Sequence, residues 1–213
     1  MKNGKIGDLQ PISLPEPVFD RCETIFEALK MRRTSRAISA KSISLQILAD
    51  ILWAAQGVNR LRGPFGGPGR TAGSASNSQE ILVYVVLEEG IFLYEPETHI
   101  LTPVAAGDSR ALAIGVGQGD AGANAPVRLV YVVDIDRFKG AGFQEPGLYD
   151  AEIQKSYYFV DSGLIAQNVY LASAALGLAS WFHNCNKTAL GKKLGLKSHQ
   201  HALFGQTVGF SED

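Results

Sequence analysis

The spacing of apolar and polar positions predicts helices near the start of the chain. Residues 24–33 place apolar side chains at helical intervals and finish on basic residues, which suits a helix C-terminus. A second helix is predicted from Ser44, as its N-cap, to Gln56, with Gly57 as the residue that stops it. Residues 1–20 contain three prolines and are expected to form an irregular arm.

The middle of the chain changes to the pattern of strands. Residues 81–87 and 91–94 are rich in β-branched and aromatic side chains and flank a short Glu-Glu-Gly turn, so they predict a hairpin. Residues 99–102 extend it as a third strand, and 127–133 form a buried strand by their density of valine. The glycine-rich and serine-rich stretch 60–79 is expected to be a loop.

The last third of the chain mixes both patterns. Residues 157–176 are apolar on nearly every helical face, which predicts a helix buried in the core or in an interface. A short strand around Trp181, a short helix over 188–194 and a final strand over 204–210 follow. This order favours an α+β fold with a mainly antiparallel sheet flanked by helices.

Composition narrows the class of protein. The 213 residues suit one domain, and 46% of them are hydrophobic while 19% are charged, which is globular composition. The net charge of −1 and the absence of a basic patch interleaved with aromatics argue against nucleic-acid binding. Two cysteines exclude a disulfide framework. Neither a signal peptide nor a membrane span is recognised, so a cytoplasmic protein is expected.

Two motifs that suggest familiar sites are discounted. Gly117, Gly119 and Gly122 satisfy the G-x-G-x-x-G pattern, but a helix-like segment precedes them and a strand follows, the reverse of a dinucleotide fold. His183 and Cys185 are too few for a zinc site, and their spacing places the two side chains on opposite faces of a strand. We therefore expect no metal site and no cysteine nucleophile.

Two polar segments carry more specific chemistry. Residues 32–36 read Arg-Arg-Thr-Ser-Arg and concentrate guanidinium and hydroxyl donors that match phosphate oxygens, although a solvated helix end would have the same composition. Residues 74–79 read Ser-Ala-Ser-Asn-Ser-Gln and lead into a strand, so their small side chains allow close approach to a flat ligand. An ordinary polar loop explains this second segment equally well.

Together these segments resemble the FMN-dependent nitroreductase family over residues 22–210. The basic stretch at 32–36 is similar to the family's Arg-Arg-Ser-x-Arg signature, and the stretch 73–79 to its Pro-Ser-x-x-Asn-x-Gln-Pro loop, with Glu80 in place of the final Pro. Residues 166–178 match the family's A-x-N-x-x-L-A-A-x-A-L-G-L helix. Several phrases, among them LADILWAAQGVNR, look most like the branch of azoline-oxidising, SagB-type dehydrogenases.

The resemblance implies a nitroreductase-like fold, a single FMN-binding domain over 1–213, and an intertwined homodimer with both FMN sites at the interface. It implies that the cofactor is held by Arg32, Arg33, Thr34, Arg36, Ser74, Asn77, Gln79, Gln118, His183, Asn184 and Cys185. The last three would offer backbone N–H groups to the flavin N5 edge. The family often has a Lys or Arg after the last strand; residues 210–213 contain none, so the basic stretch would neutralise the phosphate nearly alone.

The resemblance also implies a reaction. NADH or NADPH would pass a hydride through flavin N5 to a nitro compound, a quinone or a similar small-molecule acceptor, with ping-pong turnover and no catalytic side chain. Two alternatives stay open. One is an FMN-dependent dehydrogenase or oxidase of an organic substrate, as in azoline oxidation, and the other is a dimer that only binds flavin or another ligand.

Overall fold

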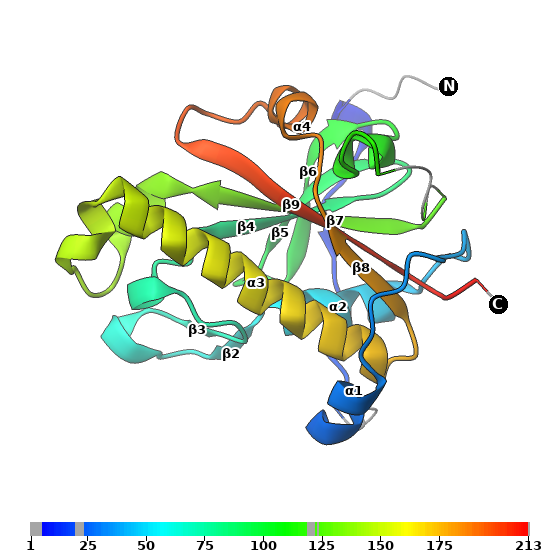
Figure 1. The fold of residues 1–213 in the computed structure, drawn as a ribbon, viewed down its shortest axis with the longest axis horizontal. Coiled ribbons are helices and arrows are strands. Elements are labelled where there is room, and N and C mark those ends of the chain that lie inside the picture. Colours follow the sequence, from blue (N-terminus) through cyan, green and yellow to red (C-terminus); the bar gives the residue numbers. More distant parts are fainter. Residues whose placement is uncertain (1–5, 20–23, 119–121, 123, 213) are drawn as a thin grey trace.

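The computed structural model describes residues 6–19, 24–118, 122 and 124–212, and a seven-stranded sheet forms its centre (Figure 1). The strand order is β1-β6-β5-β4-β7-β9-β8, and every neighbouring pair is antiparallel. The strands are β1 Ile12–Ser13, β4 Ile81–Val86, β5 Gly90–Glu95, β6 Ile100–Ala106, β7 Val127–Asp134, β8 Ala179–His183 and β9 Gln200–Gly209. The predicted α+β class is confirmed.

Helices cover both faces of this sheet. The α-helices are α1 Ile25–Met31, α2 Leu45–Gln56, α3 Ala151–Ala175 and α4 Lys187–Leu194. The 3-10 turns are η1 Ile6–Asp8, η2 Pro64–Gly66, η3 Ala75–Asn77, η4 Arg110–Ala113, η5 Ile135–Gly140 and η6 Pro146–Tyr149. Helices α2 and α3 pack on one face and α4 on the other (Figure 1).

Strand β4 shows why the middle of the sequence is continuously apolar. Val83 and Val85 point to the side of α2 and α3, whereas Leu82 and Val86 pack toward Leu190 of α4. All six residues of the strand are buried. A strand covered on both faces has no solvent side, so the usual alternation of apolar and polar residues is absent.

The predicted boundaries of α2 are confirmed, but Gly57 follows the helix for a reason other than the one expected. The Ser44 hydroxyl accepts a hydrogen bond from the N–H of Ile47 at 3.2 Å and caps the first turn. Gly57 is extended, not left-handed, and a Cβ there would lie 2.3 Å from the Trp53 indole. Close packing of the indole, not backbone handedness, therefore requires a glycine at this position.

Helix α3 begins earlier than predicted, at Ala151 instead of 157. The Asp150 carboxylate accepts hydrogen bonds from the N–H groups of Glu152 and Ile153 at 2.9 and 3.0 Å and starts the helix. The first turn is polar and exposed, so the apolar pattern did not reveal it. No helix in the described part of the chain is long and apolar enough to cross a membrane.

Three other boundaries differ. The arm is not wholly irregular, because β1 pairs with β6 and forms one edge of the sheet. The predicted loop 60–79 is not wholly irregular either, because β3 (Gly69–Arg70), inside it, pairs antiparallel with β2 (Val58–Arg60) at its start. The last strand starts at Gln200, ahead of the predicted 204, because its partner β7 continues to Asp134.

Candidate functional site

The basic segment, residues 32–36, leaves the end of α1 and runs beside strand β8. The N–H of Ser35 donates to the carbonyl of Ser180 at 3.0 Å. The hydroxyls of Thr34 and Tyr170 are 3.0 Å apart, and the Arg36 guanidinium lies 5.4 Å from the ring centroid of Trp181. The backbone of this segment is thus anchored to β8 and α3.

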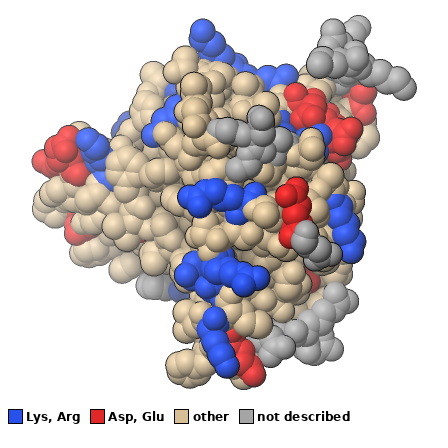
Figure 2. Space-filling model, turned by 45° about the vertical axis from the view of Figure 1, so that its right-hand side comes forward, with Lys and Arg blue, Asp and Glu red and all other residues tan. Residues whose placement is uncertain are grey.

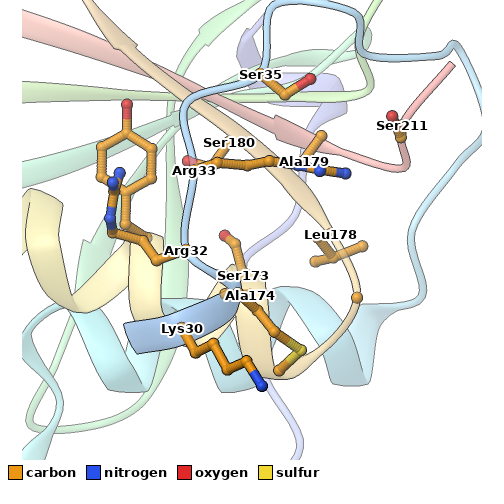
Figure 3. Close-up of a pocket in the computed structure, with 13 residues that line it drawn as sticks. Lys30, Arg32, Arg33, Ser35, Ser173, Ala174, Leu178, Ala179, Ser180 and Ser211 are labelled. Atoms are coloured by element: carbon orange, nitrogen blue, oxygen red, sulfur yellow. The ribbon is translucent and has the colours of Figure 1, made fainter. Parts of the chain in front are cut away.

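A pocket of about 410 Å³ opens beside the basic segment (Figure 3). Its size is in the range of small-molecule and cofactor sites. Basic and hydroxyl side chains line it from α1, β8 and the C-terminal segment: Lys30, Arg32, Arg33, Ser35, Ser180 and Ser211. No acidic residue is among the lining residues, so the pocket favours an anion.

The guanidinium groups of this segment are available to a ligand. Within the described ranges, Arg32, Arg33 and Arg36 form no salt bridge. Arg32 lies 5.5 Å from the ring centroid of Tyr170, so aromatic faces orient Arg32 and Arg36 without neutralising them. Figure 2 shows blue side chains on the face that carries α1 and the C-terminal end, amid mostly uncharged surface.

His183 ends β8 and serves the structure. Its Nδ1 is 2.7 Å from the carbonyl of Asn184, which can only accept, so Nδ1 carries the proton and Nε2 accepts from the Thr207 hydroxyl at 2.8 Å. Burial lowers the pKa of His183 to about 4 and keeps the ring neutral at pH 7. The predicted role of position 183 therefore rests on its backbone alone.

Asn184 and Gln118 come together at the end of β8, as two residues of one site should. The N–H of Gly115 donates to the Gln118 side chain at 2.9 Å, and a Cβ on Gly115 would lie 3.2 Å from the Asn184 Cβ. The side chain of Asn184 is exposed, and its Oδ1 accepts from the Cys185 N–H at 3.0 Å. That backbone donor, one of those predicted to reach the flavin, is occupied locally.

The Cys185 thiol is not placed for catalysis. It is buried in the core between the sheet and α4, and burial raises its pKa to about 11. The described residues contain no cluster of three His, Cys, Asp or Glu side chains that could hold a metal ion. Of the discounted glycine motif, Gly119 lies outside the described residues, and the 3-10 turn η4 lies upstream where a dinucleotide fold needs a strand.

A buried arginine that the sequence analysis missed holds the turn that carries Gln118. The Arg128 side chain, on strand β7, is fully buried and donates to the backbone carbonyls of Arg110 and Gly122. Burial lowers its pKa to about 10, so it remains charged at neutral pH. An arginine inside a run of valines was the sequence signal.

The loop 74–79 has the opposite character to the basic segment, because its polar groups bind one another. Ser74 Oγ accepts from the Gln79 N–H at 3.0 Å, and the Gln79 side-chain amide donates to Asn77 Oδ1 at 3.0 Å. Gln79 Oε1 accepts from Arg70 at 2.8 Å. The predicted ligand contacts of Ser74, Asn77 and Gln79 would use groups that already have partners.

The same loop has an unusual backbone. Ser76, Asn77 and Gln79 have φ angles of 50°, 56° and 51°, a region that non-glycine residues rarely adopt. The cavity beneath the loop is about 10 Å³, which is room for roughly one water molecule. Such strain persists only where the surrounding contacts determine the backbone, and it is common at functional sites.

Two carboxyl groups lie under the loop. Glu80, the first residue after it, is 0% exposed, and Asp161 of α3 is 5% exposed. The two carboxyl groups lie close enough that burial together with the neighbouring charge of Asp161 raises the pKa of Glu80 to about 8. The sequence analysis assigned no role to this pair.

The structure separates the predicted residues into two groups. Arg32, Arg33, Thr34, Arg36, Gln118, His183, Asn184 and Cys185 lie along β8 and its ends, whereas Ser74, Asn77 and Gln79 lie beside the middle of α3. Asp161 contacts the loop and Tyr170 contacts the basic segment. These two residues are nine positions apart in α3, which corresponds to about 14 Å along the helix axis. Tyr170 and Ser180, on the first group's side, were not predicted.

Comparisons with known proteins concern the family and the fold of the chain. The sequence profile described as the nitroreductase family matches residues 29–210. A protein of Methanocaldococcus jannaschii named as a nitroreductase is 28% identical over 186 residues, or 82% of this chain and 84% of that protein.

Solved structures show the same fold. A protein of Ralstonia eutropha described as a nitroreductase superposes with a TM-score of 0.82 at 30% identity, over 95% of this chain and 90% of that chain. A chain in the E. coli microcin synthetase McbBCD complex superposes with a TM-score of 0.68 at 17% identity, over 83% of this chain and 68% of that chain. The second likeness concerns the fold alone.

Proposed function

The chain belongs to the nitroreductase family of oxidoreductases, and we propose that it uses FMN to transfer electrons from NADH or NADPH to a small-molecule acceptor such as a nitro compound or a quinone. One observation carries the proposal: basic and hydroxyl side chains line a pocket of about 410 Å³ without an acidic lining residue, and Arg32 and Arg33 form no salt bridge with the residues that the structure describes. That donor set suits the phosphate of FMN.

The residues of this pocket fit the phosphate end of the cofactor. Arg32 and Arg33 present planar forks of N–H donors, and the nearby serine hydroxyls add single donors. Thr34 is held by Tyr170 and Arg36 lies against Trp181; neither side chain lines the pocket, but both lie next to residues that do, with their orientation already restricted. Restricted side chains lose less conformational entropy when a ligand binds.

FMN, when bound, supplies the hydride chemistry, so this chain needs only to bind and orient it. The neutral, buried His183 and the buried Cys185 thiol leave the end of β8 without an acid or base. The exposed Asn184 holds the Cys185 N–H through Oδ1, and a turn of this side chain frees that donor for the ring. Gln118 lies beside Asn184 and would contact the same part of the cofactor.

We also propose a homodimer in which the loop 74–79 of one subunit completes the site of the other. The outward face of α3 exposes Val160 (60%) and Leu164 (45%), and α1 exposes Phe26 (79%). Apolar faces of this kind mark interaction surfaces. The separation of the loop from the basic segment along α3 also supports a site built from two subunits.

Anaerobic reduction of the purified holoprotein tests the activity. With NADH or NADPH as the only reductant, the flavin absorbance is expected to bleach within the time of a turnover, and a quinone or nitro compound should restore it. Flavin that no nicotinamide reduces, but that an organic substrate does, would assign the chain to the substrate-dehydrogenase alternative. A protein that binds flavin and reacts with neither would be the non-catalytic alternative.

A further inference from the structure

Two carboxyl groups that the proposed reaction does not use hold the two ends of the loop 74–79. At the start of the loop, Asp161 Oδ2 accepts a hydrogen bond from the N–H of Ala75 at 2.9 Å. At its end, Glu80 Oε2 accepts one from the Ser78 hydroxyl at 2.6 Å. Since both carboxyl groups are buried and each holds one end of the loop, a change in their charge acts directly on the loop.

The geometry leaves a place for one proton between the two acids. Two ionised carboxylates in contact inside a protein repel each other strongly, so such pairs retain a proton. Glu80 Oε1 is buried and has no donor directed at it from the described residues, whereas Glu80 Oε2 and Asp161 Oδ2 each accept one. A proton on Glu80 Oε1, donated to Asp161, satisfies the remaining atom.

The other charged and titratable groups around the pair are already engaged. On β3, Arg70 pairs with Glu97 at 3.1 Å and with Gln79. Arg137 of η5 donates to the Gln79 carbonyl at 3.0 Å, and Tyr157 of α3 donates to Glu145 at 2.9 Å. The backbone N–H of Asp134, on β7, donates to the backbone carbonyl of Glu80. The Asp134 carboxylate accepts a hydrogen bond from the Gln200 side chain. None of these supplies a cation directly to the two acids.

We propose that Glu80 and Asp161 are positioning residues for the flavin, which hold the strained loop 74–79 in its binding conformation as long as one proton is shared between them. This inference rests on the proposed FMN site. It assigns a role to Glu80, which stands where the resembled loop has a proline and where only an ionisable residue could respond to pH.

The direction of the pH effect follows from the pair. Glu80 keeps its proton at neutral pH because burial and the Asp161 charge raise its pKa to about 8. Above that pH two negative charges face each other, and their repulsion favours moving β4 away from α3. The two ends of the loop are bonded to these two acids through Ser78 and Ala75, so they would be drawn apart, and Ser76, Asn77 and Gln79 would leave their positive-φ conformations.

The test is the dissociation constant of FMN between about pH 7 and about pH 9.5, measured by flavin fluorescence. For the natural chain, log Kd should rise above about pH 8 with a slope of up to about one per pH unit, since one proton is linked to binding. Glu80→Gln, whose amide keeps both hydrogen bonds without a charge, should bind within about twofold of the parent at pH 7 and show no such rise. Titrations of FMN itself are common to both proteins and cancel.

Two further variants separate this proton from a general effect of substitution. Ser78→Ala removes a bond that favours the ionised Glu80, so its transition should move to higher pH. Asp161→Asn removes the neighbouring charge but not the burial, so the pKa of Glu80 should fall and the rise in Kd should move to lower pH. Glu97→Gln, which alters an exposed carboxylate on the same network, should leave the transition in place.

The apoprotein supplies a readout that does not depend on flavin. The infrared spectrum at pH 7 should contain the carbonyl band of a protonated carboxylic acid, which Glu80→Gln removes, and the Ala75 amide should exchange faster above about pH 8. A chain that shows both signals but binds no FMN would contradict the proposed function and not the pair. A Kd that is flat with pH, or one that rises equally in Glu80→Gln, would overturn the inference.

Discussion

The basic segment 32–36 lies near the C-terminal end of α3 and the loop 74–79 beside its middle, and the two use their polar groups in opposite ways. Arg33 and Arg36 in the basic segment are exposed and form no salt bridge with any residue that the structure describes. In the loop, Ser74, Asn77 and Gln79 are bonded to one another or to neighbouring residues. The first region is open to a ligand, whereas the second is already saturated.

This contrast separates binding from positioning. A group with no partner in the protein exchanges only water for the ligand, so these guanidiniums can contribute a net charge-assisted bond. A group that already has a partner must exchange it, and the net gain is small. We therefore expect the basic segment to supply most of the FMN affinity and the loop to supply shape.

The largest expected effect is on the basic segment. Arg32→Ala combined with Arg36→Ala should weaken FMN binding by about 3–6 kcal/mol, or roughly a hundredfold to ten-thousandfold in Kd, because two charge-assisted contacts are lost. Fluorescence titration measures it. Arg62→Ala with Lys197→Ala removes the same charge from other exposed sites and should change Kd little. A double variant that holds flavin as tightly as the parent would show that the phosphate lies elsewhere.

The next largest effect is expected at the exposed apolar face of α3. In the proposed dimer this face would bring the basic segment of one subunit to the loop 74–79 of the other. Val160→Asp with Leu164→Asp places carboxylates on the exposed apolar face of α3, and the dimer Kd should rise more than about a hundredfold because charges would be buried without partners. Light scattering would report a monomer that has also lost flavin. Lys192→Asp on α4 is the matched control and should remain dimeric. A double variant that stays a dimer would move the interface off α3.

The third prediction concerns the buried Glu80–Asp161 pair and how the free energy of unfolding depends on pH. Since the folded pKa of Glu80, about 8, is above its ordinary value of 4.5, its contribution to the free energy of unfolding is complete below about pH 4.5 and is lost as pH rises through about 8. Urea unfolding of the natural chain should therefore weaken by on the order of 2–4 kcal/mol relative to Glu80→Gln across that window. Parallel curves for the two proteins would mean that Glu80 is ionised at neutral pH.

The smallest effect tests the strained backbone of the loop. Ser76→Gly should stabilise the chain by about 0.5–1 kcal/mol, because glycine adopts a φ of 50° without the steric cost that serine carries. Thermal unfolding measures the change. Ser198→Gly, at an exposed turn without a positive φ, should be neutral or slightly destabilising. An equal or lower melting temperature for Ser76→Gly would indicate that the loop is not strained.

The sequence predicted the sheet and helices where local patterns decide them. The buried run of β4 and the apolar stripe of α2 follow directly from composition and spacing. The first turn of α3 and the strand character of the arm were missed, because a cap at Asp150 and pairing with β6 determine them and neither leaves an apolar pattern.

The site was predictable in part for a similar reason. The basic segment is contiguous, so its chemistry is visible in the sequence. Glu80 and Asp161 are far apart in the chain and meet only when β4 packs on α3. Their only trace was a carboxylate before an apolar strand and another inside an apolar helix, and each alone resembles an ordinary polar residue at the edge of a buried element.

The visible absorbance spectrum of the purified full chain, before and after addition of FMN and removal of the excess, tests the central claim most directly. The account predicts a yellow protein whose bound-flavin band persists through gel filtration and is lost from the variant with Arg32→Ala and Arg36→Ala. A colourless protein that retains no flavin band after FMN addition would contradict it.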